Sequence, residues 1–276
     1  MSGIISKLKF VPSMLTCSSA LCGIMATFLA LDGEKSLVYA SYLILIASVF
    51  DFSDGFAARL LNAKSELGKQ LDSLADAVSF GVAPTAIMFA LMKHALKVNG
   101  SFINFEGWQI AILISCTIIV ICSILRLAKF NIDPEQSYGF KGLATPANAI
   151  LIASIPLINA MNPEDFWIYS FAHALFDVSF PFSATLALIA LQVFVFDNIW
   201  WLLPICIIFS LMMVTNVPMF SLKMKSYKYQ DNKLVYNFLI FAVIMLLIIQ
   251  WIAVPFIILG YVLVSVIKWI CTKKNK

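Results

Sequence analysis

Long apolar runs, separated by short polar stretches, occupy most of this 276-residue chain. A helix needs about 20 apolar residues to cross the hydrocarbon core of a bilayer, and eight runs reach or approach that length. Each run is predicted to be a transmembrane helix, and an even number of crossings leaves both termini on one side. The predicted spans cover residues 11–31, 37–58, 72–92, 108–130, 146–161, 199–219, 235–252 and 254–271.

The composition agrees with this pattern. The mean hydropathy is +0.92 and 12% of the residues are charged, which lies outside the range of soluble proteins. The sequence contains no internal repeat, low-complexity segment or linker of the kind that joins soluble domains. The predicted fold class is therefore all-α, a polytopic membrane helix bundle that forms a single integral membrane domain over residues 1–276.

The segment 162–198 departs from the simple pattern of spans and loops. It includes an apolar run, 182–196, that is long enough to be mistaken for another span. One additional crossing would move the lysines between 223 and 233 to the other side of the membrane. The segment is therefore predicted to be an insertion that is interfacial, re-entrant or packed against the bundle.

The basic residues are distributed unevenly between the two sides of the predicted bundle. Of the 19 lysines and arginines, sixteen fall on one side and only Lys35, Lys93 and Lys97 fall on the other. Basic residues favour the cytoplasmic side of a membrane. Both termini and the loop between the second and third spans are therefore predicted to face the cytoplasm, in a cytoplasmic or inner membrane.

Two classes of site are not expected. The formal net charge of +4 is dispersed among loops, so the chain is not predicted to bind nucleic acid. The six cysteines lie mostly inside apolar runs without C-x-x-C spacing, which argues against a zinc site or a disulfide framework.

Four of the ten aspartates fall within 26 residues, at the junction of two apolar segments. Moving an ionised carboxylate out of water costs several kcal/mol of free energy or more, unless a partner compensates for the lost hydration. The nearby basic residues Arg59, Lys64 and Lys69 are too few to neutralise four aspartates and Glu66. A divalent cation is the expected partner. The four aspartates are Asp51, Asp54, Asp72 and Asp76.

The spacing of these aspartates places each pair on one face of its helix. Asp51 and Asp54 are separated by three positions, and Asp72 and Asp76 by four. A short connection between antiparallel helices would bring the two faces together. An all-oxygen set of ligands suits Mg²⁺ or Mn²⁺ and can hold one or two ions while leaving positions for substrate phosphates.

The residues around the aspartates are small or able to bind phosphate. Gly55, Ala58 and Gly68 leave room for close helix packing or for a flat or phosphorylated ligand. The guanidinium of Arg59 suits phosphate oxygens. Any one of these residues alone would suggest ordinary helix packing, but the whole set at this spacing indicates a site.

The pattern D-x-x-D-G-x-x-A-R-x8-G-x3-D-x3-D, which runs from Asp51 to Asp76, resembles the signature of the CDP-alcohol phosphotransferase family. Members are membrane enzymes with a six-helix core that transfer a substituted phosphoryl group from a CDP-linked donor to an alcohol and release CMP. The resemblance implies two Mg²⁺ or Mn²⁺ ions and a homodimer. It implies metal binding by Asp51, Asp54, Asp72 and Asp76, with Asp76 also the general base, and CDP binding by Gly55, Ala58, Arg59 and Gly68.

Other segments are similar to the phosphatidylserine synthase branch of this family. They are the run from Asp76 to Pro84, the run from Arg126 to Asn131, and GLATPA at 142–147. Lys129 and Ala144 replace the arginine and proline that are usual in that branch, and Asn216 replaces a further arginine. The expected reaction is transfer of a phosphatidyl group from CDP-diacylglycerol to L-serine.

Serine is a zwitterion, so its site needs a cation for the carboxylate and acceptors for the ammonium. Arg126 and Lys129 are candidates for contacts with serine or the donor phosphates, although they also suit anchors at the headgroup level. The remaining candidates are Ser79, Asn131 and Thr145 for the acceptor, and Thr16 for the nucleotide.

The resemblance implies a catalytic core of about 8–225 that contains the insertion at 162–198. Residues 235–271 would then add two C-terminal transmembrane helices. Two alternatives stay open from the sequence. The acceptor could be another alcohol, such as glycerol 3-phosphate, inositol phosphate or choline. The carboxylates could instead belong to a cation-coupled transporter, because intramembrane carboxylates often mark ion paths.

Overall fold

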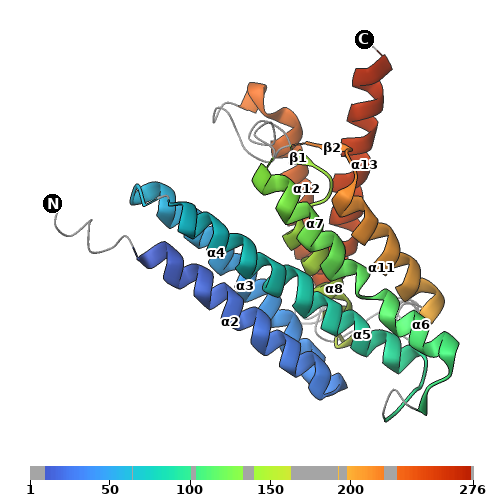
Figure 1. Cartoon of the computed structure of the whole chain (residues 1–276). Coiled ribbons are helices and arrows are strands. Elements are labelled where there is room, and N and C mark those ends of the chain that lie inside the picture. Colours follow the sequence, from blue (N-terminus) through green and yellow to red (C-terminus); the bar gives the residue numbers. More distant parts are fainter. Residues whose placement is uncertain are drawn as a thin grey trace, which may run out of the picture.

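The computed structural model describes residues 10–63, 65–100, 104–132, 140–162, 192, 198–220 and 229–274. Helices account for most of these residues, and two short strands pair antiparallel (Figure 1). The α-helices are α2 (Val11–Asp32), α3 (Glu34–Leu60), α4 (Glu66–Ala77), α5 (Ala83–Ala95), α6 (Gly107–Ser115), α7 (Ile118–Ile132), α8 (Thr145–Asn159), α11 (Ile199–Val214), α12 (Lys233–Ile249) and α13 (Ala253–Lys274). The shorter elements are the π-helix η1 (Val78–Val82), the 3₁₀ turns η5 (Tyr229–Asp231) and η6 (Gln250–Ile252), and the strands β1 (Phe140–Lys141) and β2 (Pro218–Met219).

Five helical stretches are long and apolar enough to cross a membrane, and α8 and α11 are shorter apolar helices. The eight predicted spans correspond to these helices, which confirms a polytopic all-α membrane protein. The span predicted at 199–219 was too long, because α11 ends at Val214 and residues 218–219 form the strand β2. The last two predicted spans share one stretch, which η6 divides into α12 and α13. The five long stretches are Val11–Asp32, Glu34–Leu60, Glu66–Ala95, Gly107–Ile132 and Lys233–Cys271.

Some predictions concern residues outside the described part of the chain. The insertion predicted at 162–198 lies outside it except for Asn162, Gln192 and Asn198. The two ends of the predicted core, at about 8 and 225, also lie outside it. So do several of the basic residues that set the predicted orientation, including Lys64 and the lysines at 7, 9, 223, 225 and 228.

The helices α4 and α5 form one rod, and η1 lies between them. The side chain of Ser65 caps the start of α4 by accepting a hydrogen bond from the Gly68 N–H at 3.0 Å. Within η1 the Ala83 N–H reaches back five residues to the Val78 carbonyl oxygen. The next residue, Pro84, has no N–H to donate, so a wider turn at this point accommodates the proline without breaking the rod.

The helix α2 and the π-helix η1 approach each other closely. A Cβ atom added to Gly23 would lie 2.6 Å from the Cα of Ser79. The Ser79 hydroxyl donates to the Ser19 carbonyl oxygen at 2.9 Å, and the Ser19 hydroxyl donates to the Ala47 carbonyl oxygen of α3 at 3.1 Å. Small residues therefore let three backbones approach closely and join α2, α3 and η1 by hydrogen bonds.

The other half of the protein is built on α7, α8, α11 and α13 (Figure 1). Gly142, with φ +75°, follows β1, and a Cβ atom there would lie 2.5 Å from the Met213 carbonyl oxygen. The buried Arg126 of α7 donates from Nη1 to the Lys141 carbonyl oxygen at 3.1 Å and to that of Met213 at 3.2 Å. The strand pair and the end of α11 are thus held against α7.

We predict that Gly23→Ala lowers the thermal unfolding midpoint of the purified protein in detergent. The added Cβ would clash with the Ser79 backbone, and overpacking of this kind destabilises by about 1–3 kcal/mol. Gly260→Ala is the matched control, because Gly260 is also inside a helix and the nearest atom, Phe241 Cε1, is 4.0 Å away. Equal midpoints for the two variants would contradict the predicted clash.

Candidate active site

Three of the four aspartates converge where the C-terminal part of α3 meets α4. Asp51, Asp72 and Asp76 each offer a carboxylate oxygen, and these oxygens all lie within 4.8 Å of one another. The three side chains are partly buried. Among the described residues, no lysine, arginine or histidine nitrogen lies within 4.0 Å of these carboxylates. Three close carboxylates without a cationic partner among the described residues form a group that fits a hard metal ion.

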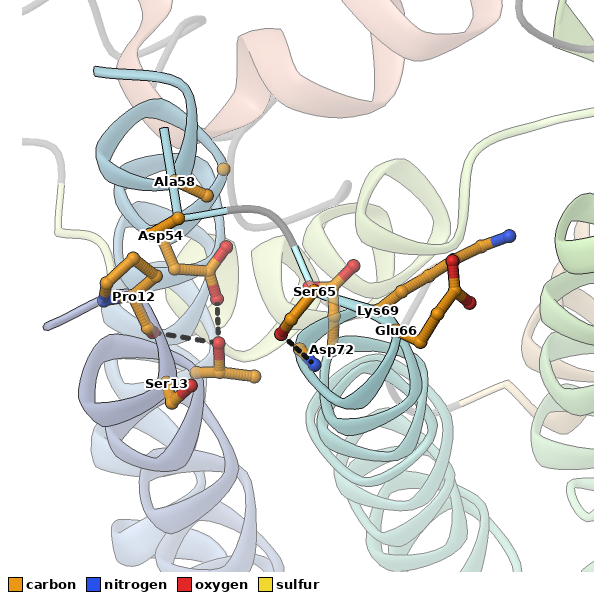
Figure 2. Close-up of a pocket in the computed structure, with 12 residues that line it drawn as sticks. Pro12, Ser13, Asp54, Ala58, Ser65, Glu66, Lys69 and Asp72 are labelled. Atoms are coloured by element: carbon orange, nitrogen blue, oxygen red, sulfur yellow. Dashed lines mark hydrogen bonds between the residues drawn. The ribbon is translucent and has the colours of Figure 1, made fainter. Parts of the chain in front are cut away.

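Asp54 lies apart from this group of three. Its side chain is buried and accepts a hydrogen bond from the Thr16 hydroxyl of α2 at 2.5 Å (Figure 2). The same hydroxyl oxygen lies 3.0 Å from the Pro12 carbonyl oxygen. Thr16 thus fixes the orientation of Asp54 toward α2, one helical turn from Asp51. The sequence predicted metal binding by all four aspartates, with Asp76 also the base. The structure brings the carboxylates of Asp51, Asp72 and Asp76 together and gives Asp54 a hydroxyl partner.

A cavity of about 560 Å³ opens beside the carboxylates, between α2, the end of α3 and the start of α4. Asp72 belongs both to the group of three carboxylates and to the wall of this cavity. A metal ion bound there would therefore face the cavity. The lining residues are Pro12, Ser13, Thr16, Asp54, Gly55, Ala58, Ala63, Ser65, Glu66, Gly68, Lys69 and Asp72.

The small residues of the motif lie at the wall of this cavity. Thr16, Gly55, Ala58 and Gly68 all line the cavity. A Cβ atom added to Gly55 would meet nothing within 4 Å. The site therefore has room beside the carboxylates, and a ligand rather than a second helix can occupy it.

Ser65 and Lys69 also line the cavity, although neither was predicted as a site residue from the sequence. Ser65 caps α4 and lines the cavity, and Lys69 adds a positive charge to the wall. The Lys69 Nζ also donates to the Asn131 carbonyl oxygen of α7 at 3.3 Å. A serine just before a helix is a recognisable cap, so the sequence contains the signal for Ser65. The signal for Lys69 is its position inside the motif, between Gly68 and Asp72.

Arg59 is exposed and does not line the cavity. Its Nε donates to the carbonyl oxygen of Gly55, one turn earlier in α3, at 2.9 Å. Arg59 therefore lies beside the site rather than in it.

The candidates for the acceptor site are dispersed. Ser79 is fully buried, and its hydroxyl joins η1 to α2. The Asn131 side chain donates to the Ser73 hydroxyl at 2.8 Å, which ties the end of α7 to α4. Thr145 is buried as the first residue of α8. None of the three lines the cavity.

Arg126 and Lys129 lie near the end of α7 and contact the other half of the protein. Arg126 is 8% exposed, and among the described residues no carboxylate lies within 4.0 Å of it. The Lys129 Nζ donates to the Val214 carbonyl oxygen at 3.4 Å. The buried Arg126 thus has backbone acceptors but no described counterion.

The profile of the CDP-alcohol phosphatidyltransferase family matches residues 9–178. A CDP-diacylglycerol--serine O-phosphatidyltransferase of Bacillus subtilis (strain 168) is 35% identical over 140 residues, which cover 50% of this chain and 71% of that protein. A protein of the same name from Mycobacterium leprae (strain TN) is 32% identical over 167 residues, which cover 58% of this chain and 51% of that protein.

An archaeal protein is also similar to this chain. The archaetidylserine synthase of Methanothermobacter thermautotrophicus (strain Delta H) is 36% identical over 149 residues, which cover 53% of this chain and 58% of that protein. The chain therefore spans between about half and 71% of the length of these curated relatives.

We predict that the group of three carboxylates dominates metal affinity. Asp51→Asn and Asp72→Asn should each weaken Mn²⁺ binding on the order of tenfold or more, because each removes a charged ligand. Asp54→Asn should cause a smaller loss, because Thr16 is its protein partner. The measurement is electron paramagnetic resonance titration of the purified protein with Mn²⁺.

Asp32→Asn is the control for this titration, because Asp32 is an exposed carboxylate at the far end of α2. Unchanged affinity in Asp51→Asn would contradict its role as a ligand. An equal loss in Asp54→Asn would show that Asp54 contributes as much to metal affinity as Asp51 and Asp72.

Proposed function

Because this chain belongs to the CDP-alcohol phosphatidyltransferase family, we propose that it transfers a phosphatidyl group from CDP-diacylglycerol to L-serine, giving phosphatidylserine and CMP. The observation that carries the proposal is the convergence of Asp51, Asp72 and Asp76 beside a cavity that other signature residues line, namely Asp54, Gly55, Ala58 and Gly68. The names of the bacterial relatives support serine as the acceptor.

The group of carboxylates is proposed to hold two Mg²⁺ or Mn²⁺ ions. Asp51, Asp72 and Asp76 would supply most of the ligands, and Asp54 would contribute from the side of the cavity. Bound divalent ions neutralise a pyrophosphate, polarise its phosphorus and stabilise the leaving CMP. Since Asp72 faces the cavity, a donor in the cavity would have its pyrophosphate next to the carboxylates.

The cavity of about 560 Å³ is proposed to receive the CDP part of the donor. Gly55, Ala58 and Gly68 would allow its close approach, and Thr16 would contact the nucleotide while it orients Asp54. Lys69 adds a charge that suits the donor phosphates. Arg59 would reach a phosphate only after its Nε leaves the Gly55 carbonyl oxygen.

Asp76 is proposed to be the general base. It lies one helical turn after Asp72, on the side of the carboxylate group that does not line the cavity. An alcohol that approaches from that side would be opposite the leaving CMP, as a single in-line displacement requires. Asp76 would accept the hydroxyl proton as the oxygen attacks the phosphorus.

Arg126 is the proposed contact for the carboxylate of serine, with Lys129 beside it. The support is that a buried guanidinium without a described counterion favours an anion. Asn131 and Thr145 are proposed to hydrogen-bond the acceptor from the ends of α7 and α8. The hydrogen bond from Ser79 to Ser19 favours a packing role for Ser79 instead.

The proposed setting is a homodimer in a cytoplasmic or inner membrane, with the active site and both termini facing the cytoplasm. The unequal distribution of basic residues supports this orientation. The proposed organisation is a single domain, 1–276, with a core of about 8–225, an insertion at 162–198 and two further helices in 235–271. The lipid donor would enter the site laterally from the bilayer, and serine would arrive from the cytoplasm.

We predict that purified protein releases CMP from CDP-diacylglycerol only when serine and Mg²⁺ or Mn²⁺ are present, and that a chelator abolishes the release. Glycerol 3-phosphate, inositol phosphate and choline, offered separately, test the acceptor. Release with one of these alcohols would keep the reaction and overturn serine. No release under any condition would overturn the reaction and favour a transporter.

An ether-linked CDP donor should be included in the same assay, because one relative is named an archaetidylserine synthase. Faster turnover with the ether donor would overturn the diacyl donor while leaving serine in place.

We predict that Asp76→Asn lowers kcat by about 10²–10⁴-fold, the usual contribution of a general base. The assay uses saturating Mn²⁺, so that weaker metal binding is compensated, and donor binding is checked by thermal stabilisation with CDP-diacylglycerol. Recovery of full kcat at high Mn²⁺ would contradict the role as base and leave Asp76 as a ligand only.

A further inference from the structure

A second cavity lies at the opposite end of α2, α3 and α5 from the aspartates. Its volume is about 610 Å³. Along α3, Glu34 and Asp51 are separated by roughly 25 Å, from a rise of about 1.5 Å per residue. That distance is close to the thickness of the hydrocarbon core of a bilayer. The cavity therefore lies at the headgroup level of the opposite membrane face.

The walls of this cavity contain all three lysines of that face. Lys35 comes from the first turn of α3, Lys93 from the last turn of α5, and Lys97 from the residues just after α5. These are the three basic residues that the sequence places opposite the other sixteen. The three basic residues predicted on this side of the membrane thus all lie around one cavity.

Among the described residues, no carboxylate oxygen lies within 4.0 Å of the three lysine nitrogens. The ion pair of this region joins His94 Nδ1 and Glu34 Oε1 at 2.5 Å. Glu34 is therefore engaged with His94 at the rim. The lining carries an excess of positive charge, and an anion in the cavity would relieve the repulsion between the lysines.

Helix ends explain only part of this arrangement. Lys93 suits the C-terminal end of α5, where a cation interacts favourably with the helix dipole. Lys35 lies at the N-terminal end of α3, where the dipole disfavours a cation. Lys97 has a φ of +54° and follows the C-cap of α5, where the Val98 N–H donates back to the Lys93 carbonyl oxygen at 3.3 Å, so its backbone conformation ends the helix. The placement of Lys35 therefore needs a reason outside helix stability.

The floor of the cavity is apolar. Ala30 and Leu37 are buried beneath it, and Leu31, Phe89 and Ala90 also line it. A smaller cavity of about 240 Å³ shares Glu34, Lys35, Leu37 and His94 and continues to α8. A cationic rim above an apolar floor, at the ends of membrane-spanning helices, suits a molecule with a phosphate and an acyl chain.

We propose that this cavity binds the phosphate of an anionic phospholipid headgroup in the membrane leaflet opposite the aspartates. Lys35, Lys93 and Lys97 would contact the phosphate, and the glycerol and upper acyl chain would cover the apolar floor. The proposal does not depend on which alcohol the active site accepts.

The test is native mass spectrometry of the full-length protein with phosphatidylglycerol or phosphatidylcholine. We expect wild-type protein to retain phosphatidylglycerol preferentially, and Lys93→Gln/Lys97→Gln to reduce that retention on the order of tenfold. Lys233→Gln/Lys268→Gln is the matched control, since it removes two exposed lysines elsewhere and should retain the lipid as wild type does. Equal thermal midpoints in phosphatidylcholine would show that both double variants are folded.

Three outcomes would overturn the proposal. They are no preference for phosphatidylglycerol, equal losses in the two double variants, and displacement of the lipid by millimolar inorganic phosphate. The last result would identify free phosphate as the ligand instead of a lipid. A loss of CMP release with normal lipid retention would concern the active site only, so the two proposals fail separately.

Discussion

The repulsion between closely spaced carboxylates is the constraint on which this structure depends. Asp51, Asp72 and Asp76 approach one another in a membrane-embedded bundle without a described lysine or arginine beside them. A bound cation or a proton shared between the carboxylates relieves such repulsion, and the surrounding helices must hold the three side chains together. The structure supplies the rigidity: α4 is capped by Ser65, and the rod that continues it is pressed against α2 through Gly23 and Ser79.

The same constraint explains how the polar residues of the interior are used. The Thr16 hydroxyl stabilises Asp54 by a hydrogen bond and holds its carboxylate apart from the group formed by the other three. Asn131 and Lys69 connect α7 to α4 across the bundle. Polar side chains that are costly in an apolar environment thus serve to hold the two halves in register around the carboxylates.

Much of the fold follows from the sequence, because the length of an apolar run directly reflects the thickness of the bilayer. The pairing of Asp72 with Asp76 also follows, since positions four apart share a helix face. The separate position of Asp54 does not follow, because its partner Thr16 is 38 residues away and spacing carries no information on that contact. The backbone contacts of Arg126 were missed for the same reason, since they depend on how β1 and α11 meet α7.

The π-helical turn η1 has a consequence for the geometry of the whole rod. A π turn holds one more residue than an α turn, so it shifts everything after it by about 100° around the helix axis. The carboxylate face of α4 and the core face of α5, with Ile87 and Met88, are therefore set at different phases on one continuous helix. If residues 78–82 were wound as ordinary α-helix with none removed, α4 would turn by about 100° relative to α5, and its aspartates would face away from α3.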